Sequence, residues 1–260
     1  MTGAPYKAAV IANGPVGYWR LDDATGPAAS NQIGGGGAGV YAGLFGLGQA
    51  GPFNDATCMF TPPSGGYVQL PINTPAVLIP SCLELVCKWT PGQTSYAAVR
   101  QTGGTAATAQ QELSAQTIAF EAGVFNAAVD QNVFGFAPYG NGNWHHVVVN
   151  YDTGTCVLFI DGVQDVSLSG LLAPNVLANP FWTIGGWGFR AASAVTRTNG
   201  LWAEVALYGH VLTAAQVATH FAALAANAQS AVGGPPSGAV VTAGLDAILA
   251  AVRKLFVNQP

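Results

Sequence analysis

The sequence predicts an all-β protein of the sandwich or barrel type, with helical segments toward its C-terminus. Its 260 residues include 34 glycines and 16 prolines, which divide the chain into short segments rich in β-branched and aromatic residues. Short strands separated by such turn residues are typical of a sandwich or barrel, whereas βαβ units alternate strands with long helices. We expect strands over residues 16–21, 67–70, 83–89, 96–101, 117–121, 144–151, 156–163, 181–184 and 201–208.

A three-stranded antiparallel meander is the clearest local pattern. The β-rich runs 144–151 and 156–160 are separated by Asp-Thr-Gly-Thr, and a second turn at Asp161-Gly162 leads into residues 163–166. Asp-Gly and Gly-containing turns between such runs are typical of hairpins. By contrast, the glycines of 34–37, followed by Gly39, have too much backbone freedom for a strand and predict a loop.

One well-marked helix follows the last expected strand. Thr213 is a candidate N-cap and Gln216 lies three residues later, which is the spacing of a capping box. Val217, Phe221 and Leu224 then recur at helical spacing on one face. We expect this helix to pack beside the sandwich and to end near Asn227.

The last thirty residues differ from the rest of the chain. We expect a domain over 1–230, a Gly/Pro linker over 231–239, since Pro cannot continue a helix, and an amphipathic helix over 240–260. Alternatives for the helix are packing on its own domain, self-association or docking into a larger assembly, because a short isolated helix is marginal in water. Its apolar stripe, the candidate oligomerisation surface, has heptad spacing: Val241, Leu245, Ile248, Val252 and Leu255.

The low charge excludes several classes of protein. Only 8% of residues are charged and the formal net charge is −4, which argues against a nucleic-acid binder held by a basic stripe. With 50% hydrophobic residues the chain is not of the disordered type.

Mean hydropathy is +0.34, yet no run of about 20 apolar residues predicts a membrane span. Either partner subunits cover much of the surface, or neutral polar residues solvate it. We expect no secretory signal.

Cysteine and carboxylate patterns give no sign of catalysis. The four cysteines match no zinc spacing, and Cys82 and Cys87 point to opposite faces of a strand, so buried free thiols are expected. A glycosidase needs two carboxylates flanking the scissile bond. No such pair is evident, no nucleophile or phosphate-loop motif is present, and four glutamates each stand alone: Glu84, Glu112, Glu121 and Glu204. The chain is therefore predicted not to be an enzyme.

The histidines are interpreted as structural. His146 lies two positions after Trp144, so in a strand the two share a face, and we expect a core histidine there. His145 then points the other way, toward the surface. His210 and His220 have no acidic residue near them in sequence and receive no role.

Candidate glycan-binding residues lie in two loops. Sugars bind through aromatic faces together with neutral hydrogen-bonding groups, which do not require charge. The alternative is that Trp182 and Trp187 cap the sandwich core. The candidates, in the glycine-rich segments 138–143 and 179–190, are Tyr139, Asn141, Trp187, Phe189 and Arg190.

Five segments, taken in order, carry a resemblance to a known family. They are residues 15–23 (Pro-Val-Gly-Tyr-Trp-Arg-Leu-Asp-Asp), 56–71, the Trp-His-His-Val to Asp-Gly stretch 144–162, 183–186, and 201–217. Together they resemble laminin G-like domains with the concanavalin A-like jelly roll. The resemblance implies an all-β jelly-roll sandwich with a short N-terminal helix and a helix after the last strand, to which the C-terminal amphipathic helix predicted from the heptad spacing is added.

The resemblance also implies a setting and a possible ion. This version of the domain is similar to modules of tailed-bacteriophage virion proteins, above all minor tail proteins, so we expect a structural or host-attachment role in a virion assembled in the bacterial cytoplasm. Partners would be other virion proteins, further copies of the chain and a host-surface glycan; the alternatives are a capsid decoration protein or a free bacterial glycan-binding module. Many family members hold calcium, which prefers several carboxylates. No cofactor is expected here beyond a weak calcium site at Asp22, Asp23 and Glu204.

Overall fold

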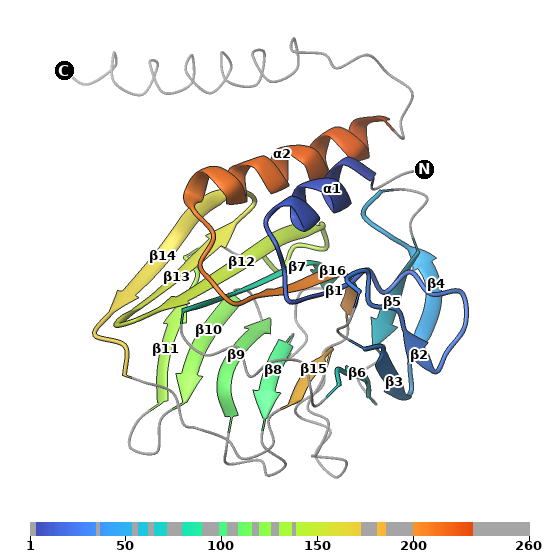
Figure 1. Cartoon of the computed structure of the whole chain (residues 1–260), viewed down its shortest axis with the longest axis horizontal. Helices are drawn as coiled ribbons and strands as arrows, with labels where there is room; N and C mark the ends of the chain where they lie inside the picture. Colours follow the sequence, from blue (N-terminus) through green and yellow to red (C-terminus); the bar gives the residue numbers. More distant parts are fainter. Residues whose placement is uncertain are drawn as a thin grey trace, which may run out of the picture.

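The computed structural model describes two antiparallel sheets packed face to face. It describes residues 4–34, 37–53, 57–61, 65–71, 80–89, 99–102, 109–115, 120–125, 130–136, 139–172, 181–185 and 200–230. The first sheet has the order β14-β13-β12-β7-β16-β5-β4, with β1 also paired to β16, and the second has the order β11-β10-β9-β8-β15-β6-β3-β2. Both sheets and their two helices can be followed in Figure 1.

The strands of the first sheet are β1 (Gly17–Trp19), β4 (Gly46–Ala50), β5 (Thr57–Thr61), β7 (Ser81–Trp89), β12 (His145–Asp152), β13 (Thr155–Ile160), β14 (Val163–Ser169) and β16 (Gly200–Tyr208). Those of the second are β2 (Ala28–Ala29), β3 (Gly39–Gly43), β6 (Gly66–Gln69), β8 (Val99–Thr102), β9 (Ala109–Ala115), β10 (Phe120–Phe125), β11 (Asp130–Phe134) and β15 (Phe181–Ile184).

The central strands of the first sheet are buried on both faces. In β7, Leu83, Leu85, Cys87 and Trp89 point into the core between the sheets, while Cys82 and Val86 point to the opposite face. Side chains alternate along a strand, so a strand covered on both sides has a nearly continuous buried sequence. This is the origin of the buried run from Ser81 to Cys87.

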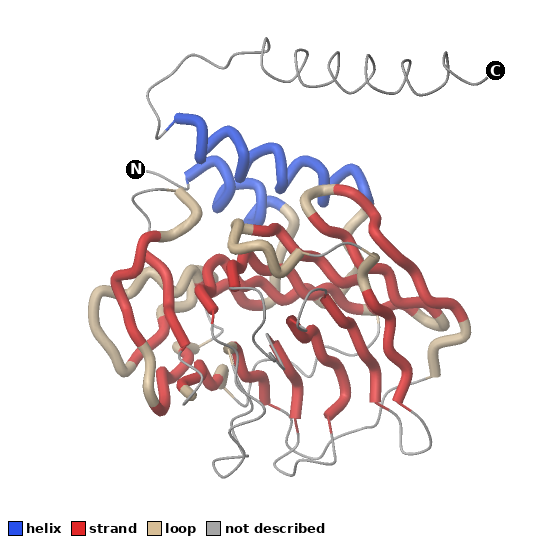
Figure 2. Tube along the Cα trace, turned by 180° about the vertical axis from the view of Figure 1, so that it is seen from behind, coloured by secondary structure: helices blue, strands red, loops and turns tan. Residues whose placement is uncertain are grey.

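Two helices cover the outer face of this sheet, as both views show (Figures 1 and 2). Helix α1 (Ala4–Ala12) and helix α2 (Ala214–Ser230) contact each other, and Tyr6, Val10, Val217 and Leu224 pack against apolar residues of the sheet. The expected N-terminal helix and the helix after the last strand are therefore confirmed. Burial of these apolar faces holds both helices, because most of the stability of a helix in a protein comes from packing of its apolar face.

The predicted meander is confirmed as β12, β13 and β14. Asp152 pairs with Thr155 around a two-residue turn, and Ile160 pairs with Val163 around Asp161-Gly162. Both turn residues of the second hairpin have positive φ, 51° at Asp161 and 82° at Gly162, as a type I′ turn requires. A Cβ at residue 162 would lie 2.9 Å from the Cβ of Phe221, so a glycine also lets α2 approach the turn.

The capping box and the thiol predictions are confirmed. The Gln216 N–H donates to Thr213 Oγ1 at 3.2 Å, and the Thr213 N–H donates to Gln216 Oε1 at 2.8 Å. The four cysteines are free and buried, and Cys82 and Cys87 lie on opposite faces of β7. Helix α2 extends to Ser230, three residues beyond the expected end.

Several expectations about strands were wrong. The loop expected at the glycine cluster includes Gly39, which instead begins β3, where a Cβ would lie 3.0 Å from Val68 and 3.2 Å from Leu70. Of the expected strand 117–121, residues 117–119 lie outside the described residues, and residues 120–121 begin β10, which continues to Phe125. Strands β3, β4, β9 and β11 were not predicted, because their Gly-, Ala- and amide-rich sequences lack the β-branched alternation on which the prediction depended.

None of the described helices has the length and apolarity needed to cross a membrane. The expected linker at 231–239 and the expected helix at 240–260 lie outside the described residues, and so does its candidate oligomerisation stripe.

Candidate functional site

The predicted glycan-binding residues divide between described and undescribed parts of the chain. Trp187, Phe189 and Arg190 lie outside the described residues, whereas Tyr139 and Asn141 lie in the segment that enters β12. Around them the structure brings together a set of polar and aromatic side chains that we call the rim cluster: Tyr139, Asn141, His145, Asp161 and Asp165.

Within the rim cluster, His145 connects Asp161 to Asn141. Its Nδ1 lies 2.8 Å from Asp161 Oδ2 and its Nε2 lies 3.0 Å from Asn141 Oδ1. The backbone N–H of Asn143 also donates to Asn141 Oδ1 at 2.9 Å, which fixes that atom as the amide oxygen. The second oxygen of Asp161 accepts from the His146 N–H at 2.9 Å. The loop 141–143 is therefore fixed to the β13–β14 turn through one imidazole.

Also in the rim cluster, Asp165 binds Tyr139 and the backbone of Phe136. Strand β14 has a register shift: Val166 opposes Leu158 and Gln164 opposes Phe159, so Asp165 is the extra residue of a bulge. Its carboxylate crosses to the neighbouring loop, where Oδ1 accepts from the Tyr139 hydroxyl at 2.8 Å and Oδ2 accepts from the Phe136 N–H at 3.0 Å.

Gly185 and Gly200 flank the segment 186–199, which lies outside the described residues. Gly200, directly after it, pairs with Trp89 in β7, and the Trp89 ring centroid lies 6.4 Å from that of His145. Gly185, directly before it, lies against Thr61, which also pairs with Gly200. Both attachment points of the segment that contains Trp187, Phe189 and Arg190 are thus at the end of the sandwich where β12 begins.

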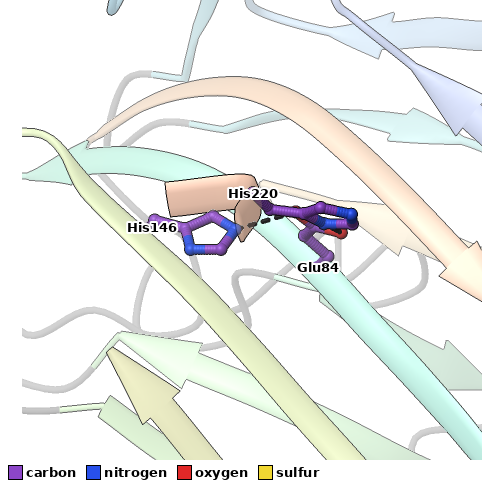
Figure 3. A group of neighbouring side chains, drawn as sticks. All are labelled: Glu84, His146 and His220. Carbon is purple, nitrogen blue, oxygen red and sulfur yellow. Dashed lines mark hydrogen bonds and ion pairs between the residues drawn. The ribbon is translucent and has the colours of Figure 1, made fainter. Parts of the chain in front are cut away.

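A second group of polar residues is buried beneath the helices, and we call it the Glu84 cluster: Glu84, His146, His220, Tyr6 and Tyr208. The imidazoles of His146 and His220 both lie beside the Glu84 carboxylate (Figure 3). His146 Nε2 lies 2.7 Å from Glu84 Oε1, and His220 Nδ1 lies 2.9 Å from the same oxygen. The hydroxyls of Tyr6 and Tyr208 donate to Oε1 and Oε2 at 2.7 and 2.6 Å.

The Glu84 carboxylate is ionised because its neighbours donate to it. Burial raises the pKa of the Glu84 carboxyl, but the hydrogen bonds from His146 and His220 outweigh burial and hold it well below the ordinary value. Burial lowers the pKa of His220, and the contact with Glu84 outweighs this too, so it lies above the ordinary value. The cluster joins α1, β7, β12, β16 and α2 at one point.

Glu84, His146 and His220 also form a possible metal-ligand set. Their ligand atoms lie within 4.8 Å of one another, and two imidazoles with one carboxylate suit zinc. The nitrogen-to-oxygen distances are those of hydrogen bonds, however, and an ion would displace both. A zinc-bound imidazole also needs an acceptor for its other nitrogen, whereas no described group hydrogen-bonds to His146 Nδ1. The residues fit a hydrogen-bonded carboxylate better than a metal centre.

Two of the three predicted calcium ligands, Asp22 and Glu204, contact an arginine. Arg20 Nε donates to Glu204 Oε1 at 2.9 Å, and its Nη1 lies 2.8 Å from Asp22 Oδ2. The Tyr18 hydroxyl also donates to Glu204. Asp23 instead accepts from the N–H and the hydroxyl of Ser30 and from the Tyr41 hydroxyl. A cation already neutralises Asp22 and Glu204, so the contacts do not favour calcium, and that site stays a prediction.

We call Arg20, Asp22, Glu204 and Tyr18 the Arg20 cluster. Glu204 is buried in it with φ of 56°, at the register shift between β16 and β7. Burial raises the pKa of the Glu204 carboxyl to about 7, although Arg20 and Tyr18 act in the opposite direction. A glycosidase acid has a pKa raised in this way, but it must also reach its substrate. Glu204 is buried and bonded to Tyr18 and Arg20, so it does not meet the second requirement.

One sequence-based interpretation of a single residue was wrong, and several contacts of other residues were missed. His145, expected at the surface, is only 6% exposed, since both faces of β12 are covered. His220, given no role, contacts Glu84, and neither Glu84 nor Glu204 stands alone. The core position of His146 is confirmed, and so is the burial of Trp182. The partners of Glu84 come from four distant segments, so spacing could not reveal them.

Comparison with known proteins finds one matching family model, described as the concanavalin A-like lectin/glucanases superfamily, over residues 86–218. Nothing among curated proteins matches the chain. Of solved structures, domain 4 of AbnA, an extracellular arabinanase from Geobacillus stearothermophilus in complex with arabinotriose, is similar with a TM-score of 0.58 and 16% identity, over 79% of this chain and 97% of that one.

Two further structures share the fold with parts of larger proteins. The botulinum neurotoxin serotype G binding domain has a TM-score of 0.59 at 10% identity, over 80% of this chain and 50% of that one. The Trypanosoma rangeli sialidase in complex with sialic acid has a TM-score of 0.58 at 16% identity, over 79% of this chain and 32% of that one. This chain therefore corresponds to half of the toxin domain and about a third of the sialidase.

Proposed function

The chain belongs to the concanavalin A-like lectin/glucanase superfamily, and from that premise we propose that it is a non-enzymatic glycan-binding module of a bacteriophage virion. In this proposal the module acts in host attachment, most simply as part of a minor tail protein. One observation carries the glycan-binding part. The loop with Tyr139 and Asn141 and both attachment points of the segment with Trp187, Phe189 and Arg190 lie at one end of the sandwich.

Two features support binding rather than hydrolysis. The buried glutamates Glu84 and Glu204 are both hydrogen-bonded within their clusters, so neither is available to protonate a glycosidic oxygen. The rim cluster, in contrast, holds aromatic and amide groups in fixed positions beside solvent. The similar AbnA domain is described with a bound arabinotriose, which shows that such a domain of that protein can hold a trisaccharide.

The virion setting rests on the opening Tyr-Trp-Arg-Leu-Asp segment and on the low charge. Only 8% of residues are charged, a composition that favours a surface largely covered by other subunits. A capsid-surface position and a free bacterial glycan-binding module are the alternatives. Removal of residues 231–260, followed by light scattering of the full and shortened chains, separates assembly through the C-terminal segment from a monomeric module.

The glycan-binding part is tested on a glycan array and on cell-wall polysaccharide of host bacteria. We expect the full chain to bind without releasing sugar, and Trp187→Ala or Asn141→Ala to weaken binding at least about fivefold, since stacking and hydrogen-bonding groups contribute about 1 kcal/mol each. Val40→Ala, an exposed position on β3 in the other sheet, is the matched control. Binding should persist in EDTA, because the proposed contacts are ring stacking and hydrogen bonds. Sugar release, or binding that neither variant changes, would contradict the proposal.

A further inference from the structure

An aromatic surface outside the sequence-based candidates borders the rim cluster. Phe134 and Phe136, at the end of edge strand β11, are 55% and 81% exposed. Exposing two such rings to water is unfavourable, by tens of calories per mole for each square ångström of apolar surface. Single exposed apolar residues are ordinary, but two aromatic rings beside a fixed polar cluster need an explanation.

The backbone that carries these rings is held in place on both sides. Phe134 pairs with Glu121 in the ladder between β10 and β11, the Gly135 N–H donates to Phe120 O at 2.8 Å, and the Phe136 N–H donates to Asp165 Oδ2. A Cβ at residue 135 would lie 2.8 Å from that same Asp165 oxygen. The glycine thus allows the carboxylate to approach, and the two rings are presented by a fixed backbone rather than by a free loop.

Asp165 is placed beside the backbone of Phe136 as an acceptor. The bulge in β14 turns its carboxylate toward residue 136, and each of its oxygens has only one hydrogen bond among the described residues, from Tyr139 and from Phe136. A carboxylate has about four acceptor positions, so it can accept further hydrogens from sugar hydroxyls. An aromatic face beside such an acceptor suits a ring that is apolar on one side and bears hydroxyls at its edge.

The charge of the surface selects the class of sugar. Asp165 contacts the Phe136 backbone and Asp161 belongs to the adjoining rim cluster, and in the part of the chain that the structure describes neither has a lysine or arginine partner. An acidic sugar would be repelled by these carboxylates, whereas a neutral pyranose would not. We propose that Phe134, Phe136 and Asp165 form a subsite for a neutral pyranose that stacks on the exposed rings. This inference rests on the proposed glycan-binding function and assigns it a place and a ligand class.

The test uses the full chain labelled with ¹⁵N and titrated with maltotriose, cellotriose and chitotriose as neutral probes and with trigalacturonate as the acidic probe. We expect at least one neutral probe to shift the amide signals of Gly135 and Phe136, and trigalacturonate to leave them unchanged. Phe136→Ala should weaken that binding about tenfold by calorimetry, and Phe134→Ala less. Val163→Ala removes a side chain that is also strongly exposed, at 69%, and should have no effect.

The outcomes separate this inference from the proposed function. If the chain binds a neutral probe or host polysaccharide and Phe136→Ala does not weaken it, the subsite is wrong and the glycan-binding function stands. If trigalacturonate shifts the same amides, the ligand class is wrong. If Phe136→Ala instead abolishes a dimer seen by sedimentation, the rings serve a protein contact and the subsite is wrong. If no saccharide binds the wild-type chain at all, both proposals fail. An unchanged melting temperature of each variant shows that the fold is intact.

Discussion

Two buried glutamates in neighbouring strands of the same sheet have pKa values that are shifted in opposite directions. Glu84 in β7 and Glu204 in β16 are both almost fully removed from solvent. The pKa of Glu84 is held well below its ordinary value, whereas that of Glu204 is raised to about 7. Burial raises both, so the difference comes from the groups around each carboxylate.

The Glu84 cluster supplies four donors to one carboxylate, two imidazoles and two tyrosine hydroxyls, with no second acid in it. The Arg20 cluster supplies one tyrosine and one arginine, and the arginine is shared with Asp22. A shared cation and a neighbouring negative charge offset burial less completely than four dedicated donors do. The hydrogen bonds and charges of His146 and His220 therefore outweigh burial at Glu84, whereas at Glu204 the contacts with Arg20 and Tyr18 do not, and Asp22 opposes them.

Removing the Glu84 carboxylate should have the largest effect. Glu84→Ala leaves two imidazoles and two hydroxyls buried without their acceptor, and we expect the free energy of unfolding to fall by about 3–5 kcal/mol. Urea unfolding followed by tryptophan fluorescence measures it. Glu84→Gln keeps the shape of the side chain and one acceptor oxygen, so its loss of unfolding free energy should be clearly smaller than that of Glu84→Ala. Equal losses in the two variants would mean that packing, not hydrogen bonding, holds the helices at this point.

The Glu204 site should give the second-largest effect, and it should appear as a pH dependence. Because the folded pKa of about 7 exceeds the ordinary value of 4.5, the folded chain holds more protons between these values, and stability falls as pH rises from 4.5 to 7. Integrated over that window the loss is about 3 kcal/mol. Glu204→Gln cannot titrate, so its unfolding free energy should vary less across the same window.

Two other groups must be separated from Glu204 in that experiment. The Glu84 contribution is present above pH 4.5 and is lost as pH falls below it, so it does not change within the window. The raised pKa of His220 adds stability that is lost as pH rises above 6.5, which has the same sign as the Glu204 effect. The difference between wild type and Glu204→Gln isolates Glu204. A difference that stays constant from pH 4.5 to 7 would contradict the raised pKa.

The sequence was sufficient for the parts of the fold that have local signals. The β12–β14 meander and the Thr213 capping box each follow from residues within a few positions of one another. Strands such as β4, with the sequence Gly-Leu-Gly-Gln-Ala and a largely exposed surface, have no alternation to detect. Their pairing is set by neighbours in the sheet, which a single sequence does not display.

The candidate sites were predictable only in part, for a related reason. Alternation placed His145 and His146 on opposite faces of β12, which is correct, but it could not show that both faces are covered. The unbroken run of three valines after them was a signal that the strand is buried on both sides. Glu84 meets partners 62 to 136 residues away, and Asp165 reaches the rim only because of a bulge.

The smallest expected effect compares one tyrosine hydroxyl from each cluster. Tyr6→Phe removes one of four donors to Glu84 and should cost about 1 kcal/mol. Tyr18→Phe removes one of two side-chain donors to Glu204, and it should lower the unfolding free energy by a similar amount. It should also raise the Glu204 pKa, which shifts the pH-dependent loss of stability to higher pH. Unfolding curves of both variants between pH 4 and 8 measure this. If Tyr6→Phe shifts that pH profile as much as Tyr18→Phe does, the two clusters are coupled, and the contacts within each cluster do not by themselves set the acid strength of its glutamate.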